Sequence, residues 1–386
     1  MNKHLKLSPD TIKICLVFFG WKALLAIVSL LAIRLIPLGY TDRFLGGGPI
    51  NFKLTPAFFS WANFDGEHYL SIAMFGYKGL EQAFFPVYPL LISFFAKLFS
   101  QDLMSLLINS TIVGLIISNA TFLIALLFLY DLIRIDFPKK IAFFVILLII
   151  CFPTSFFFGA VYNESLFLLL TVLAFLHARK GNWFWASIFG MIAAATRIFG
   201  VLLFPAFIVE AILQKKYKQA FWIFLIPAGL GLYMYFQYLN VGDALAFYHI
   251  QTLVGEQRQS NLVILPQVYF RYIKMIFTVD MQNPIYQTVL LEFITGIAFF
   301  ILPIYGYFKK IRASYLFYAF VGFIITTVQG SFSSVPRYVL VFFPSFIALA
   351  IWFDRFPRFL KIIFLSISAL LLIIEAALFL RGYWIA

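Results

Sequence analysis

Apolar segments of roughly 20 residues recur along the whole chain, and short breaks rich in lysine and arginine separate them. A helix of that length crosses the hydrocarbon core of a bilayer, which is about 30 Å thick. Hydrophobic residues make up 63% of the 386 residues and charged residues only 12%, whereas about a quarter of the residues in a soluble domain are charged. The sequence therefore predicts an all-α, polytopic membrane protein with one integral membrane domain over residues 1–386.

Positive charge is concentrated in the breaks between the apolar segments. The net charge is +13, and the basic residues form six clusters. These clusters are Lys3/Lys6/Lys13, Arg134/Lys139/Lys140, Arg179/Lys180, Lys215/Lys216/Lys218, Lys309/Lys310/Arg312 and Arg355/Arg358/Lys361. Short loops of this kind are typically cytoplasmic, whereas a nucleic-acid site gathers its charge on one face with aromatic residues between. We therefore expect the lipid bilayer, and no nucleic acid, as a partner.

Placing all six clusters in the cytoplasm determines the path of the chain. It predicts about 11 spans, with the N-terminus inside and the C-terminus outside. The predicted spans are 13–37, 103–130, 141–158, 164–178, 183–196, 198–213, 220–238, 285–308, 314–329, 337–353 and 360–380. Residues 38–102 and 239–284 then form two long extracytoplasmic loops. Because 84–99 is short for a crossing, we expect it to lie at the outer interface or to dip partway into the membrane.

The first long loop contains the most polar motif of the chain, N-F-D-G-E-H-Y-L, which begins at Asn63. If residues 64–75 are helical, Asp65, His68 and Tyr69 share one face, and Gly76 ends the helix. A carboxylate, an imidazole and a phenol on one face could activate a hydroxyl group or hold a metal. The alternative is an interfacial helix whose Asp65 only caps its N-terminus.

Three further polar groups lie at the predicted outer ends of spans. The first is Asn163 with Glu164, and Glu164 could be only an acidic residue in the first turn of a helix. The second is Arg197 in T-R-I-F-G, between two short helices. A guanidinium there suits the phosphate of a lipid, or it could simply snorkel to the interface. The third is Arg337 with Tyr338, in S-S-V-P-R-Y.

Three other residues of chemically reactive types are weaker candidates for a functional role. His249 in the second long loop is expected to be solvated, and Cys15 and Cys151 are expected to be free thiols. The sequence has no D-x-D, no P-loop and no G-x-G-x-x-G, so nothing in it supports a nucleotide-sugar donor.

The order of these motifs resembles the PIG-V family of mannosyltransferases, the GPI mannosyltransferase 2 type, including its prokaryotic relatives. The resemblance covers about residues 60–345 and rests on F-D-G-E-H-Y-L, F-F-P-V-Y-P, Y-N-E-S-L-F, T-R-I-F-G and P-R-Y. It implies a GT-C type of fold with juxtamembrane helices in the first outer loop. It also implies a polyprenyl(dolichyl)-phosphate sugar donor and an extracytoplasmic active site. Asp65, Glu164 and Arg197 match the family's motif residues, whereas Phe64 replaces an expected Trp.

The resemblance implies an inverting transfer of a sugar, most simply mannose, to a glycolipid or glycan acceptor. Asp65 would be the general base, Glu164 would assist it or orient the sugar, and Arg197 with Arg337 would bind the donor phosphate. Further candidates for substrate binding are Glu67, His68, Tyr69, Asn163 and Tyr338. The sequence identifies no cofactor. Two separate carboxylates could bind a divalent cation, but no tight cluster demands one.

The membrane would be the plasma membrane in a prokaryote and that of the endoplasmic reticulum in a eukaryote. Two other classes of function share the same charge pattern. The chain could be a transporter or flippase of lipid-linked sugars, although it shows no inverted repeat of the kind that secondary transporters have. It could also be a non-catalytic membrane subunit.

Overall fold

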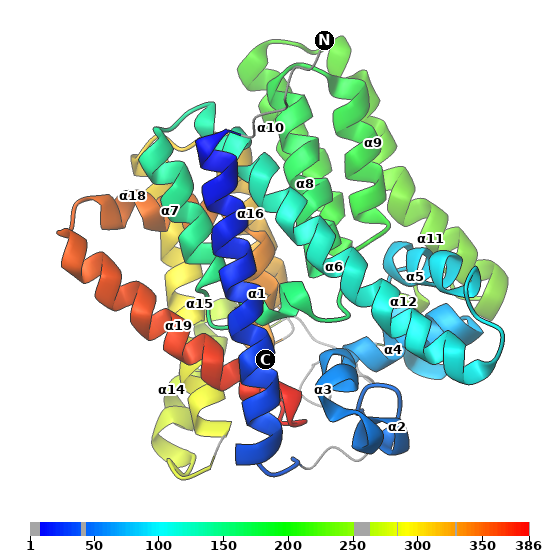
Figure 1. The fold of residues 1–386 in the computed structure, drawn as a ribbon. Helices are drawn as coiled ribbons and strands as arrows, with labels where there is room; N and C mark the ends of the chain where they lie inside the picture. The colour runs from blue at the N-terminus through cyan, green and yellow to red at the C-terminus, as the bar shows by residue number, and fades with distance from the viewer. Residues whose placement is uncertain (1–7, 40–43, 251–262, 284, 329, 386) are drawn as a thin grey trace, which may run out of the picture.

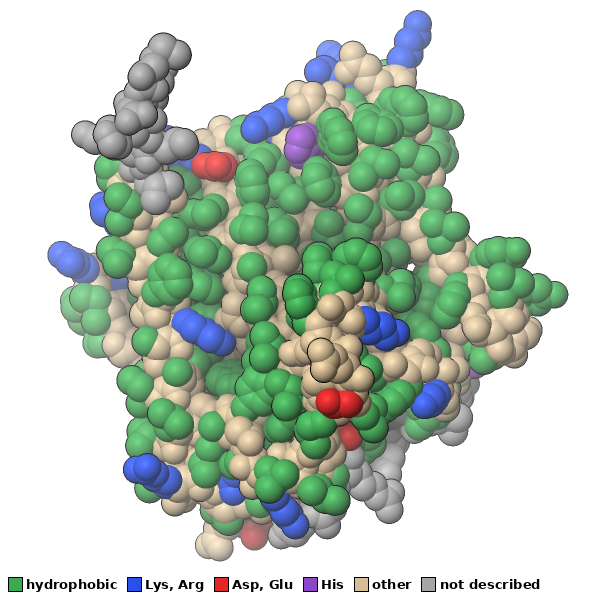
Figure 2. Space-filling view, turned by 45° about the vertical axis from the view of Figure 1, so that its right-hand side comes forward, with side chains coloured by type: hydrophobic (Ala, Val, Ile, Leu, Met, Phe, Trp, Pro, Cys, Tyr) green, Lys and Arg blue, Asp and Glu red, His purple; other side chains and the backbone are tan. Residues whose placement is uncertain are grey.

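The computed structural model describes residues 8–39, 44–250, 263–283, 285–328 and 330–385, which fold into helices and contain no strand (Figure 1). Within them, five helical segments are long and apolar enough to cross a membrane. These are α1 (Pro9–Leu35), α6 (Leu103–Arg134), η5 with α11 (Gln219–Val241), α15 (Ile285–Phe308) and α19 (Arg358–Leu380). Much of the face drawn in Figure 2 is covered by hydrophobic side chains, as expected for helices that face lipid.

The other predicted spans are also helical, but they are shorter. They are α7 (Lys139–Ile150), α8 (Glu164–Arg179), α9 (Trp183–Ala194), η4 with α10 (Ile198–Leu202, Leu203–Gln214), α16 (Ala313–Thr327), α17 with η6 (Val335–Tyr338, Val339–Val341) and α18 (Phe343–Asp354). Val335–Val341 and α18 count as a sixth crossing only if they form one span bent by 88°. The predicted number of 11 spans is therefore not confirmed, because several of these helices are shorter than a bilayer requires.

Helices also fill the first long loop. They are α2 (Pro49–Leu54), α3 (Pro56–Phe59), η1 (Ser60–Ala62), α4 (Asp65–Phe75), η2 (Gly79–Ala83) and α5 (Val87–Lys97). The prediction of a helix over 64–75 is confirmed, and Gly76 ends it with a φ of 78°, which only glycine adopts easily. In Figure 1, α2, α3 and α4 lie together at the lower right, whereas α8, α9 and α10 stand side by side at the top.

The second long loop contains α12 (Ala246–His249) and α14 (Leu265–Thr278). Its middle part, residues 251–262, lies outside the described residues. The His249 ring is largely exposed and pairs with Asp243 at 2.7 Å, in keeping with a solvated histidine. Cys15 and Cys151 are both free, as predicted.

Ion pairs join the basic breaks to one another at one end of the molecule, which we call the basic end. Near the start of α1, Asp10 pairs with Lys139 at 2.9 Å, and the neighbouring Lys140 pairs with Asp354 at 2.5 Å. A second chain of contacts runs from Asp136 to Arg179, to the buried Glu210 and to Arg312. Breaks that are far apart in sequence therefore lie on the same side of the molecule.

Candidate active site

Asp65 is the first residue of α4, and its position is fixed by the two residues before it. Phe64 has a φ of 57° and a ψ of −119°, a conformation that a bulky residue adopts only when its surroundings impose it. The Phe64 amide donates to the Phe44 carbonyl at 2.8 Å, and its ring packs on Phe379 and Trp384. The buried Asn63 side chain binds the Gly46 amide and the Phe379 carbonyl, each at 3.0 Å. These contacts fix the backbone at the start of α4, and with it the position of Asp65.

The turn before α8 packs directly against the start of α4. The Val161 amide donates to the Trp61 carbonyl at 2.9 Å, and the Tyr162 hydroxyl donates to the Asn63 carbonyl at 2.8 Å. Close approach depends on Gly66, because a Cβ there would lie 3.3 Å from the Val161 carbonyl oxygen. Glu164, the first residue of α8, is thereby brought beside the start of α4.

Arg337 reaches the same place from the C-terminal third of the chain. Ser334, just before α17, has a left-handed φ of 63°. Its amide donates to Glu292 Oε1 at 3.1 Å, and the Tyr272 hydroxyl donates to Glu292 Oε2 at 2.6 Å. The Thr154 hydroxyl also donates to the Pro336 carbonyl at 2.6 Å. These contacts hold the strained turn that delivers the Arg337 side chain.

Four charged side chains from four separate segments meet here, and we call them the ion-pair cluster. Arg337 binds Asp65 Oδ2 through one terminal nitrogen and Glu164 Oε1 through Nε, the latter at 2.5 Å. Arg197 binds the same Glu164 oxygen at 2.6 Å. The sequence analysis singled out all four residues, and the structure brings them together.

The cluster is almost entirely shielded from solvent. The side chain of Glu164 is 0% exposed, those of Arg337 and Arg197 are 8% and 9% exposed, and that of Asp65 is 27% exposed. Two positive and two negative groups compensate one another, as buried charges require. Removing one partner of such a buried pair typically costs about 3–5 kcal/mol. Asp65 is the most accessible group, and Glu164 is the centre on which both arginines depend.

Aromatic rings and one amide complete the surroundings of the arginines. The Arg337 guanidinium lies 4.5 Å from the ring centre of Tyr162, and that of Arg197 lies 5.5 Å from the Tyr338 ring. Both distances suit cation–π contacts. Asn163 accepts a hydrogen bond from Arg197 at 3.2 Å and donates to the Thr196 carbonyl at 2.9 Å. Asn163 and Tyr338, both predicted to bind substrate, therefore flank Arg197.

The other predicted residues lie on α4 around the cluster but make different contacts. Tyr69 is buried and packs edge-on against Tyr88, with 5.1 Å between ring centres. His68 stacks on Phe84 at 4.8 Å. Glu67 Oε2 is buried and has no hydrogen-bond partner among the described residues, and burial raises the pKa of this carboxyl to about 7. The face shared by Asp65, His68 and Tyr69 is thus largely filled by aromatic packing.

Sequence reasoning missed Glu292 and Tyr272, which support the Arg337 turn. Glu292 is an acidic residue within an apolar 24-residue helix. An ionisable residue in such a segment is a functional candidate by default, so its position was a usable signal.

A divalent cation would have to use Asp65 and Glu164, which guanidinium groups bind in this structure. In the part of the chain that the structure describes, no group of three or more His, Cys, Asp and Glu is placed to hold a metal.

The structural comparisons match crystal structures of the oligosaccharyltransferase of Archaeoglobus fulgidus. The apo form matches 95% of this chain at 15% identity with a TM-score of 0.49, and the complex with Zn and sulfate matches 94% at 16% identity with a TM-score of 0.45. An archaeal AglB structure with an inhibitory peptide and a dolichol-phosphate matches 95% at 16% identity, with a TM-score of 0.43. The chain spans 56%, 53% and 56% of these three chains, respectively.

No curated protein sequence matches the chain. A family model does: residues 48–223 match the family described as Mannosyltransferase (PIG-V). This stretch contains Asp65, Glu164 and Arg197, whereas Arg337 lies beyond it and is placed at the site by the fold. The match confirms, for residues 48–223, the resemblance to the PIG-V mannosyltransferases.

Proposed function

We propose that the protein is a membrane glycosyltransferase of the mannosyltransferase type. It transfers a sugar from a polyprenyl-phosphate donor to a lipid-linked or glycan acceptor on the extracytoplasmic or lumenal side. The observation that carries the proposal is the ion-pair cluster, in which Arg337 and Arg197 converge on Glu164 beside the more accessible Asp65. Three of these residues lie in the segment that matches the mannosyltransferase family.

Asp65 acts as the general base. As the acceptor oxygen attacks the anomeric carbon, its proton passes to the Asp65 carboxylate, and the bond between that carbon and the phosphate oxygen breaks. The bonding electrons leave with the polyprenyl phosphate, which gains one negative charge. The 27% exposure of the Asp65 side chain is consistent with an approach by the acceptor.

The two arginines stabilise the departing phosphate, because fixed positive charge is most effective where negative charge develops. Arg337 binds Asp65 in this structure, so the donor phosphate would compete with Asp65 for the same guanidinium. Binding of the donor would then release Asp65 Oδ2 from Arg337, and this oxygen would accept the proton.

Glu164 holds both guanidiniums through Oε1, while its buried Oε2 has no hydrogen-bond partner among the described residues. Because the Glu164 side chain is 0% exposed, Oε2 would accept from a sugar hydroxyl only after the cluster opens to admit the donor. Asn163 and Tyr338, beside Arg197, would line the donor site. Glu67 and His68, which are half-buried on α4, would lie nearest the acceptor, and the buried Tyr69 would support them.

The test is transfer of labelled mannose from a polyprenyl-phosphate mannose to acceptors in a lipid extract of the source cells. The purified protein is reconstituted in vesicles, and the Asp65→Asn variant is the control. A new glycosidic bond formed only by the unmodified protein supports the proposal. Movement of labelled donor across the bilayer without transfer indicates a transporter. Transfer that appears only when a second protein is added indicates a non-catalytic subunit. Inclusion of a chelator tests for a divalent cation.

A further inference from the structure

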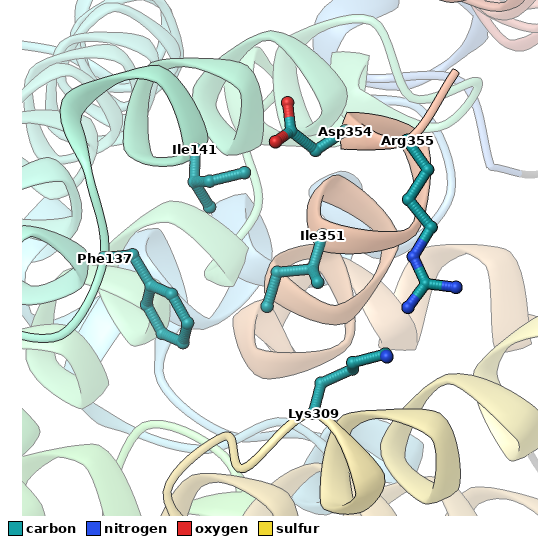
Figure 3. Close-up of a pocket in the computed structure, with 6 residues that line it drawn as sticks. All are labelled: Phe137, Ile141, Lys309, Ile351, Asp354 and Arg355. Atoms are coloured by element: carbon teal, nitrogen blue, oxygen red, sulfur yellow. The ribbon is translucent and has the colours of Figure 1, made fainter.

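A pocket of about 450 Å³ opens at the basic end, between the start of α7 and the ends of α15 and α18 (Figure 3). We call it the basic pocket. It is lined by Phe137, Ile141, Lys309, Ile351, Asp354 and Arg355. The pocket has no contact with the ion-pair cluster, whose residues come from other segments, and the proposed reaction does not use it.

Two cations converge on this pocket without a carboxylate of their own. Lys309 Nζ and the Arg355 guanidinium lie 5.5 and 5.9 Å from the centre of the same ring, that of Tyr305. Among the described residues neither forms an ion pair, and the acidic lining residue, Asp354, is bound by Lys140 at 2.5 Å. Because both cations line one pocket, an anion bound in it would offset their mutual repulsion.

The remaining lining is apolar. Phe137 and Ile141 lie on the side away from the two cations, and Ile351 lies between these two groups (Figure 3). A free inorganic anion gains nothing from such a lining. The combination of apolar lining and cationic rim matches a phospholipid, whose acyl chains and phosphate meet at one point.

We propose that the basic pocket binds the headgroup of an anionic phospholipid. Lys309 and Arg355 contact its phosphate, and the start of its acyl chains packs on Phe137, Ile141 and Ile351. The position of the pocket at the basic end agrees with this proposal, because basic clusters face the cytoplasmic leaflet, where anionic lipids attract them. A lipid in this place would bridge α7, α15 and α18.

The test uses the full-length purified protein and mass spectrometry of intact protein–lipid complexes. Phosphatidylglycerol and phosphatidylcholine are added in competition. We expect a preference for phosphatidylglycerol that falls about fivefold in Lys309→Gln and again in Arg355→Gln, as for the loss of one cation near an anionic headgroup. Lys218→Gln removes the same charge from another exposed basic break and should leave the preference unchanged.

Two outcomes overturn the proposal. The first is an equal loss in Lys218→Gln and Lys309→Gln, because the effect would then come from the surface charge as a whole. The second combines two results: inorganic phosphate releases the lipid, and Ile351→Asn leaves the lipid affinity unaltered. The Ile351→Asn variant makes the apolar lining polar while keeping both cations. This combination of results would indicate a site for a free anion. Melting temperatures in detergent without added lipid confirm that each variant is folded.

Discussion

Asp65 and Glu164 differ in how many arginines of the ion-pair cluster they bind, so their substitutions should separate effects on catalysis from effects on stability. Without Asp65, Arg337 still binds Glu164, whereas without Glu164 both arginines lose their common partner. We expect Asp65→Asn to lower turnover at least about 10²-fold, as for the loss of a positioned base, with a smaller loss of stability than in Glu164→Gln because the Asp65 side chain is 27% exposed. Glu164→Gln should lower the free energy of unfolding by about 3–5 kcal/mol.

Turnover and melting temperature are measured on the same preparations, with Asp243→Asn in the exposed second loop as the control. Unchanged turnover in Asp65→Asn would show that another group is the base. A stable Glu164→Gln protein would show that the arginines have other partners.

Arg197 is expected to contribute to donor binding beyond its structural contacts with Glu164 and Asn163. Arg197→Ala should raise the KM for the donor, and Arg197→Lys should recover only part of the loss, because an ammonium lacks the bidentate geometry of a guanidinium. Because both arginines bind one Glu164 oxygen, the effects of Arg197→Ala and Arg337→Ala should not add. Intact donor KM with a lower melting temperature would mean that Arg197 is only structural.

Glu67 should make stability depend on pH. Burial raises its pKa from 4.5 to about 7, so the folded protein retains this proton between those values while the unfolded chain releases it. Stability therefore falls as pH rises from about 4.5 to about 7. Glu67→Gln removes this pH dependence of stability. As the pH rises from 5 to 8, the melting temperature of Glu67→Gln should therefore increase relative to that of the unmodified protein. A constant difference across that range would exclude an effect of Glu67 ionisation.

At the scale of elements, short sequence motifs correctly predicted the features that depend only on neighbouring residues. Gly76 ended the predicted helix correctly, and Arg197 lies between α9 and η4 as the short apolar segments indicated. The predicted count of about 11 spans is not confirmed, because several apolar helices are shorter than a bilayer and hydropathy does not report where a helix bends. The support of Arg337 by Glu292 and Tyr272 joins α14, α15 and the 331–338 segment, and sequence periodicity carries no information on such contacts.

Glu292 should act on the reaction by positioning the turn that carries Arg337. Glu292→Leu leaves the Ser334 amide and the Tyr272 hydroxyl without their acceptor, and a displacement of Arg337 of even 1 Å could lower kcat up to about 10²-fold. In Glu292→Gln the amide oxygen still accepts from Ser334, so turnover should stay near that of the unmodified protein.

The fraction of folded protein is measured alongside kcat. A Glu292→Leu protein with less folded material but normal kcat per folded molecule would show that Glu292 only stabilises the fold. Equal loss in Glu292→Gln and Glu292→Leu would show that acceptance from Ser334 alone is not sufficient and that the second carboxylate oxygen, which accepts from Tyr272, is also required.

At the scale of the whole molecule, charge is divided between two ends with different organisation. At the basic end, Lys139, Lys140 and Lys361 pair with only two carboxylates, those of Asp10 and Asp354. At the other end, the ion-pair cluster is electrically balanced and buried. The first arrangement suits an anionic membrane surface, and the second suits a site that admits a charged substrate into an otherwise apolar protein.

This division leads to a prediction of topology. Gln101, after α5, and Gln219, beside the basic cluster at 215–218, are both exposed. Each is replaced by cysteine in a Cys15→Ser/Cys151→Ser background and treated in intact cells with a thiol reagent that cannot cross the membrane. The positive-inside rule predicts that the basic end faces the cytoplasm. Gln101→Cys should therefore be labelled in intact cells and Gln219→Cys only after the membrane is opened. The reverse pattern would place the ion-pair cluster on the cytoplasmic side, where the proposed extracytoplasmic transfer could not occur.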